Sequence, residues 1–190
     1  MNAQEESQDS ASEQRNVWSA PPRAQELLAQ LKNRRSVRRF SAEETSEEQI
    51  AFLLEAARWA PTALQCWRFV AVQNESLLST LIDLAPGILG RPSAVIVVCA
   101  DMDVIRSTQI YPELALQETA MASQNILLAA SALGLGGCFI GSFSKKGIAV
   151  ALNLPSNLDI HNLIALGYPA ETVTPPPRKP IAEILIRSRS

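Results

Sequence analysis

Histidine is almost absent from this sequence, because His161 is the only one in 190 residues. A Ser-His-Asp or Cys-His nucleophile would have to use it, and the residues around it form no such pattern. The cysteines are equally sparse: Cys66, Cys99 and Cys138 are far apart, so no two have the spacing of metal ligands. The sequence therefore argues against a zinc site and against a hydrolase that uses a histidine base.

Long apolar runs and an excess of either charge are also missing. No apolar stretch reaches the ~20 residues of a membrane-spanning helix, and the polar N-terminus lacks a signal-peptide core. The formal net charge is −2, whereas a general nucleic-acid surface needs basic residues spread over a face. An odd number of cysteines in apolar surroundings is typical of reduced thiols. We therefore expect a cytoplasmic protein that binds neither membranes nor nucleic acids.

The common nucleotide-binding loops are missing as well. The sequence contains no phosphate-binding loop with its lysine. The glycine-rich stretch Gly134–Gly137 lies between a predicted helix and a predicted strand, whereas a dinucleotide-binding loop joins a strand to a helix. An enzyme with so few acids, bases and nucleophiles in recognisable motifs would take its reactivity from a cofactor.

The chain does contain a mixture of helix and strand patterns after a polar tail. Residues 1–20 are expected to be disordered, and residues 21–190 are expected to form a single domain. Ala94–Ala100 is nearly all apolar and β-branched, which predicts a central strand covered on both faces. Leu114–Leu133 predicts the longest helix, which is apolar on most faces and hence central or at a subunit interface. Strands and helices alternate irregularly, so we expect an α+β sandwich.

The most unusual stretch is Arg34–Phe40, in which four arginines fall within six positions around Ser36. Like charges this close repel one another unless solvent or an anion neutralises them. Arginine also presents a planar fork of donors that suits phosphate or carboxylate. On its own the stretch is a solvated basic bend or, alternatively, an anion site built on a turn between two helices.

Three motifs taken together favour the anion site. The first is Arg34–Arg38, the second is Ala60–Phe69, and the third is Leu133–Phe143, with Gly167–Pro169 and Pro177–Pro180 behind it. In this order, and over nearly the whole chain after the tail, the sequence resembles the FMN-dependent nitroreductase family. The resemblance implies a short member with a three-layer sandwich, in which helices flank a mostly antiparallel central sheet. It also implies a homodimer with shared active sites and a C-terminal extension exchanged between the subunits.

The apolar segment Ile181–Ile186 is the part of this extension that we expect to cross to the partner. Strand addition would satisfy its backbone hydrogen-bonding groups. The second motif departs from the family pattern, because Pro61 and Trp67 are closer together and Cys66 replaces the usual proline. The usual asparagine is absent, and Gln65 replaces either it or the usual glutamine. This departure leaves the shape of the substrate side of the pocket open. The sequence also has no long insertion between the second predicted strand and the long helix, so we expect a short member with a more open site.

The resemblance implies a role for each residue that matches a family motif. Arg34 and Ser36 would hold the phosphate and ribityl chain of FMN, with Arg178 as a second phosphate ligand and Arg35 contributing through its backbone. Arg38 would place a cation near flavin N1 and the C2 carbonyl, where reduced flavin gains negative charge. The partner subunit would supply Pro61, Thr62 and Ala63, which together with Gln65 would form a wall of the flavin site. The flavin N5 and O4 edge would face backbone groups of Ile140, Gly141 and Ser142.

The activity implied by the resemblance is hydride transfer from NADH or NADPH to an organic acceptor, such as a nitroaromatic or a quinone, by a ping-pong mechanism. No side chain is expected to transfer a proton at N5. Two alternatives stay open. One is a specialised flavin enzyme of the same fold that dehydrogenates or dehalogenates a substrate or breaks down the flavin. The other is a non-catalytic module whose arginines bind a phosphorylated ligand.

Overall fold

A computed structural model describes residues 19–108, 111 and 113–186. Residues 1–18, most of the expected tail, lie outside the described residues. The elements follow one another along the chain as α1 (Pro22–Asn33), α2 (Glu47–Arg58), β1 (Trp67–Val72), α3 (Glu75–Leu84), β2 (Ala94–Asp101), α4 (Met102–Arg106), α5 (Glu113–Ala132), β3 (Gly136–Ile140), α6 (Lys145–Ala151), β4 (Leu158–Gly167) and α7 (Ile181–Ile184).

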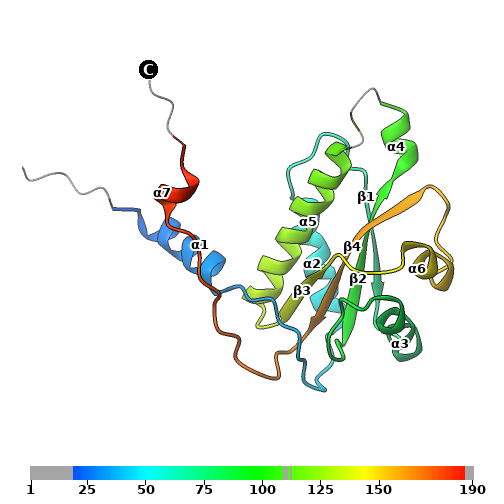
Figure 1. The fold of residues 1–190 in the computed structure, drawn as a ribbon, viewed down its shortest axis with the longest axis horizontal. Coiled ribbons are helices and arrows are strands. Elements are labelled where there is room, and N and C mark those ends of the chain that lie inside the picture. Colours follow the sequence, from blue (N-terminus) through cyan, green and yellow to red (C-terminus); the bar gives the residue numbers. More distant parts are fainter. Residues whose placement is uncertain (1–18, 109–110, 112, 187–190) are drawn as a thin grey trace, which may run out of the picture.

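The four described strands form one sheet in the order β1-β2-β4-β3, and every neighbouring pair is antiparallel (Figure 1). Every residue of β2 is buried, as its apolar and β-branched sequence predicts. Trp67 pairs with Ala100 at one end of β2, and Leu166 pairs with Ala94 at the other end. These two pairs define the opposite ends of the sheet.

Helices cover both faces of the sheet, which gives the three layers that the family resemblance implies (Figure 1). On one face α2 and α5 pack on the sheet, with Leu53 and Ile126 next to Ile96 of β2. On the other face α3 and α6 contribute Leu81 and Ile148 to a second core. Alternate residues of the central strands point to the two cores, so both faces are apolar.

The long helix α5 is central, which is one of the two positions expected from its apolar composition. It contacts α1, α2 and all four strands of the sheet. It ends before Gly134, whose φ of +78° lies in the left-handed region that favours glycine at a helix C-terminus. The helix α2 begins after Ser46, which forms a reciprocal capping box with Gln49.

The described C-terminal segment is not the strand that we expected. Residues Ile181–Ile184 form the short helix α7, so the strand prediction is wrong for these residues. Its apolar side chains, such as Ile181 and Ile184, are exposed, as are Leu27 and Leu28 of α1. Figure 1 shows both helices outside the three layers. None of the described helices is long and apolar enough to cross a membrane.

Candidate active site

The arginine-rich stretch is fixed along the edge strand β3. Ser36 forms an isolated parallel bridge with Gly137, and the Val37 N–H donates to the carbonyl oxygen of Gly137 at 3.1 Å. The Val37 side chain is buried, whereas Arg38 on its C-terminal side is exposed. This alternation buries the apolar residue and leaves the adjacent cation in solvent. We call residues 34–38 the arginine turn.

Two cations of the arginine turn have no protein counter-charge among the described residues. Arg39 lies 3.6 Å from a carboxylate oxygen of Glu171, but no such ion pair involves Arg34 or Arg38. Both act on β3: burial raises the pKa of the Cys138 thiol, and the charges of Arg38 and Arg34 partly offset that increase. The turn therefore presents positive charge that an anion could neutralise.

Arg35 differs from the other arginines, because its side chain is part of the scaffold. Its guanidinium donates to the carbonyl oxygens of Val173 at 3.2 Å, of Arg34 at 2.9 Å, and of Lys32. These bonds connect the C-terminal end of α1 to the extension that follows β4. These bonds use Nε and Nη1 of Arg35 for the scaffold, which fits the expected backbone role without testing it.

The segment Ile140–Ser142 continues from the end of β3 and has an open backbone edge. Within the described part of the chain, the N–H groups of Gly141 and Ser142 donate no hydrogen bond, and both residues are exposed. A Cβ atom on Gly141 would meet only Phe139 Cε1, at 4.0 Å. The fold itself therefore does not require glycine here, and the missing side chain leaves room for a flat group at the edge.

A loop that the sequence analysis left without a role connects the arginine turn to this edge. The N–H of Gly87 donates to the carbonyl oxygen of Ser142 at 3.2 Å. A Cβ atom on Gly90, whose φ is +79°, would lie only 2.7 Å from the carbonyl oxygen of Arg38. The loop thus contacts both segments and holds them together. Two glycines within four residues were the available signal, since close backbone approach is a common reason for glycine.

The expected wall Pro61–Gln65 lies at the other end of the sheet in the same chain. It directly precedes Trp67, which pairs with Ala100. The arginine turn lies beside Gly137, which pairs with Leu166 next to the opposite end of β2. The wall also adjoins the edge strand β1 and the arginine turn adjoins the opposite edge strand β3, so that β2 and β4 lie between them. One chain therefore does not bring the wall and the arginine turn together, and their meeting across a dimer stays a prediction.

Arg178 is exposed on the extension that follows β4. Its guanidinium donates to the carbonyl oxygens of Pro176 at 3.4 Å and Pro177 at 3.2 Å. It makes no hydrogen bond to another residue of the described chain. Its expected contact with a phosphate also stays a prediction.

His161 lies in the interior strand β4, and its side chain is almost completely buried. Its Nδ1 is 2.8 Å from Thr119 Oγ1, and its Nε2 is 3.4 Å from Asp159 Oδ2. Lys145 donates to the same carboxylate at 2.8 Å, which explains a lysine at the start of α6. Burial lowers the pKa of His161, and Asp159 opposes this effect. The residue is thus a neutral core group rather than a base at the site.

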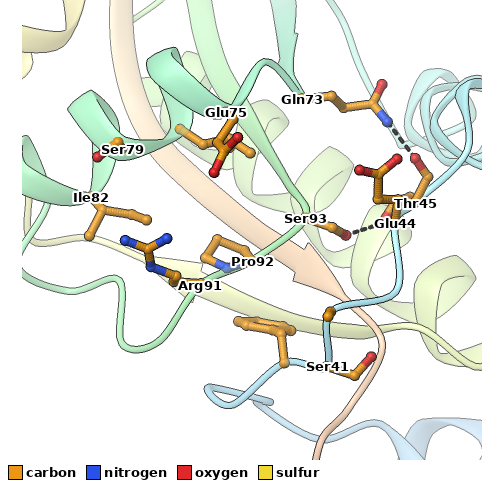
Figure 2. Close-up of a pocket in the computed structure, with 13 residues that line it drawn as sticks. Ser41, Glu44, Thr45, Gln73, Glu75, Ser79, Ile82, Arg91, Pro92 and Ser93 are labelled. Atoms are coloured by element: carbon orange, nitrogen blue, oxygen red, sulfur yellow. Dashed lines mark hydrogen bonds between the residues drawn. The ribbon is translucent and has the colours of Figure 1, made fainter.

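Two cavities among the described residues are lined by few of the residues predicted to bind flavin. A cavity of about 620 Å³ lies between the segment after Phe40, the helix α3 and the residues around Pro92. Figure 2 shows Glu44, Glu75 and Arg91 on its wall. The described residues that line it include none of those expected to bind FMN. A second cavity, of about 390 Å³, adjoins the arginine turn but contains only Arg35 of that set.

Comparison with known proteins identifies the class to which this arrangement belongs. The sequence matches the profile of the nitroreductase family over residues 31–90 and 83–168. A Methanothermobacter thermautotrophicus protein assigned to NADH dehydrogenase/NAD(P)H nitroreductase is 35% identical over 154 residues, covering 77% of this chain and 78% of its own. The oxygen-insensitive NADPH nitroreductase of Salmonella typhimurium is 31% identical, covering 80% of this chain and 69% of its own.

A solved structure agrees with the sequence matches. A Desulfovibrio desulfuricans protein in complex with FMN superimposes with a TM-score of 0.77 at 30% identity, covering 90% of this chain and 99% of its own. The chain therefore belongs to the nitroreductase family.

Proposed function

We propose that this protein is an FMN-dependent oxidoreductase that takes hydride from NADH or NADPH and passes it to an organic acceptor such as a nitroaromatic or a quinone. Relatives carry the names of NADPH nitroreductase and FMN reductase, and a structural neighbour contains FMN. The observation that carries the proposal is the pair of cations Arg34 and Arg38 beside the open backbone edge at Gly141 and Ser142. One end of this arrangement suits a phosphate, and the other suits the polar edge of a flavin.

The residues present fit FMN by their donor chemistry. Arg34, with the hydroxyl of Ser36, would bind the phosphate and the ribityl chain, and Arg178 would complete the phosphate site. The N–H groups of Gly141 and Ser142 would donate to the flavin edge. When bound, FMN would accept and return the hydride. Arg38 would hold positive charge near the position where negative charge develops, and the exposed open side would admit the reductant and the acceptor in turn.

We further propose that the functional unit is a homodimer located in the cytoplasm. The separation of Pro61–Gln65 from the arginine turn supports a site completed by the partner. The exposed apolar residues of α1 and α7 support an interface larger than ~2,000 Å², as in obligate dimers. All three cysteines are buried and free, which suits a reducing compartment.

The experiment that tests this function is purification followed by anaerobic reduction. The protein should retain one flavin per subunit, and NADH or NADPH should bleach the flavin absorbance. Nitroaromatics or quinones should then restore the absorbance. In steady-state assays, double-reciprocal plots of rate against reductant concentration at several acceptor concentrations should give parallel lines, as a ping-pong mechanism requires. A flavin that neither nicotinamide reduces would favour a specialised flavin enzyme, and a protein that binds no flavin would favour a phosphoryl-binding module.

A further inference from the structure

A completely buried carboxylate supports the loop that precedes β1. Glu118 lies in the first half of α5 and has no solvent exposure. Its Oε1 accepts hydrogen bonds from the backbone N–H groups of Ala63 at 2.6 Å and Leu64 at 2.9 Å. Its Oε2 is 3.5 Å from the Cys66 thiol. Within the described residues no cation pairs with it, so the loop supplies the donors that stabilise it.

These donors are strong enough to keep Glu118 ionised. Burial raises the pKa of a carboxyl group, and it does so here. The hydrogen bonds from Ala63, Thr62, Leu64 and Cys66 outweigh that effect and hold the pKa of Glu118 below its usual range. A buried charge satisfied in this way makes its donors hard to displace, because each lost bond would leave an unpaired polar group.

The loop is also bonded to itself, so its backbone donors are turned inward. Thr62 Oγ1 accepts from the N–H groups of Leu64 at 3.2 Å and Gln65 at 2.7 Å. Gln65 has a φ of +49°, in the left-handed region that a non-glycine residue seldom adopts. Its backbone is held there while its side chain is exposed. The outer surface of Thr62–Gln65 therefore has a shape that is fixed by hydrogen bonds on its inner side, to Glu118 and to Thr62 Oγ1.

We propose that Glu118 is a positioning residue for the substrate side of the active site. It holds Thr62–Gln65 in the conformation in which their outer surface forms the wall that faces the acceptor and the nicotinamide. The inference rests on the proposed function, since it assigns that wall to the flavin pocket. Because the N–H groups of residues 63–65 are bound to Glu118 and Thr62, the wall selects substrates by shape and stacking rather than by binding an anionic group.

The test compares Glu118→Ala and Glu118→Gln with Glu113→Gln, which changes an exposed glutamate on the same helix. We expect Glu118→Ala to bind as much FMN per subunit as the wild type and to have the same reduction potential, because Glu118 lies at the loop and not at the arginine turn. Its KM for both substrates should rise at least tenfold. Glu118→Gln retains one acceptor oxygen and should show a smaller rise, whereas Glu113→Gln should match the wild type.

The outcomes separate a positioning role from a merely structural one. KM values within twofold of the wild type in flavin-loaded Glu118→Ala would overturn the proposal, even if its melting temperature fell. If Glu118→Ala does not fold, Glu118→Gln decides, and an unchanged KM in that variant would overturn the proposal.

Amide hydrogen exchange provides a second test of the role of Glu118, and this test does not depend on enzyme activity. The amides of residues 63–65 should exchange at least tenfold faster in Glu118→Gln or Glu118→Ala than in Glu113→Gln. Unchanged exchange would overturn the role of Glu118. A wild-type protein that nicotinamide cannot reduce would instead refute the proposed function, and the exchange result would still show whether Glu118 holds the loop.

Discussion

The side chain of Val37 fills the space that a side chain at position 136 would need. A Cβ atom on Gly136 would lie 2.6 Å from Val37 Cβ and 2.7 Å from both its methyl groups. The adjacent bond from Val37 N–H to the Gly137 carbonyl oxygen fixes the same contact from the backbone side. The distance between β3 and the arginine turn thus depends on one glycine.

Replacing this glycine should therefore disturb the site through the scaffold. Gly136→Ala should reduce the free energy of unfolding by about 1–3 kcal/mol, because the backbone must shift to admit the methyl group. It should also weaken FMN binding, since the arginine turn moves. Urea unfolding and flavin titration measure the two effects. For the stability measurement alone, Gly141→Ala is the matched control, because its Cβ would meet only Phe139 Cε1 at 4.0 Å and should leave the stability unchanged.

Arg34→Ala should yield a folded protein that has lost its flavin. A phosphate dianion would lose a charge-assisted donor worth ~1.5–3 kcal/mol, which corresponds to roughly a tenfold to hundredfold weaker affinity. Absorbance of the purified protein and fluorescence titration with FMN measure the loss. Arg39→Ala removes a neighbouring exposed arginine and should keep full flavin. Full retention of FMN in Arg34→Ala would remove this residue from the phosphate site.

Arg38→Ala should change the reactivity of the flavin more than its binding. Without this cation the reduced flavin is less stable, so the reduction potential should fall and hydride uptake should slow. Arg38→Lys should restore part of the rate, since the charge matters more here than the guanidinium fork. Redox titration and stopped-flow reduction of the FMN-loaded variants provide the measurements. A wild-type potential and rate in Arg38→Ala would make this residue only a surface or phosphate contact.

The single histidine gives a prediction about pH. Its pKa in the folded state is lowered from the ordinary value of 6.5, so the unfolded chain binds the proton more readily. Stability should therefore fall as the pH decreases below 6.5, towards the folded-state pKa, by at most ~1.4 kcal/mol per pH unit. Urea unfolding at several pH values in this window measures the slope. His161→Gln should flatten it, and an equal slope in this variant would assign the effect to other groups.

Much of the fold could be predicted because strong local patterns agree with the packing. The short β-branched run at Ala94–Ala100 is typical of a buried strand and the 20-residue apolar run of α5 is typical of a buried helix, and both elements lie where these patterns suggest. The strand β4 begins at Leu158, although only its later part, Leu163–Leu166, has the continuous apolar sequence of a buried strand. Its first residues include Asp159 and His161, whose polar side chains find partners on α5 and α6. Local sequence does not reveal partners that the tertiary structure supplies.

The candidate site likewise contains residues that the sequence predicts and residues that it does not. The arginine turn and Ile140–Ser142 were predictable from motifs, since donor chemistry is visible in the residue types. Glu118 was not, because an isolated glutamate in an apolar helix carries no sign of the loop that it binds. For Ile181–Ile184, apolar composition alone suited a strand and a helix equally, and the structure has a helix.

The position of β4 constrains when the protein can become complete during synthesis. β4 is the last strand along the chain, yet it lies inside the sheet between β2 and β3. Until Gly167 has left the ribosome, β3 has no neighbour in the sheet, and the arginine turn has no fixed edge to lie on. The nascent chain can therefore assemble β1 with β2 early, but the arginine turn acquires a defined geometry only after β4 has been synthesised.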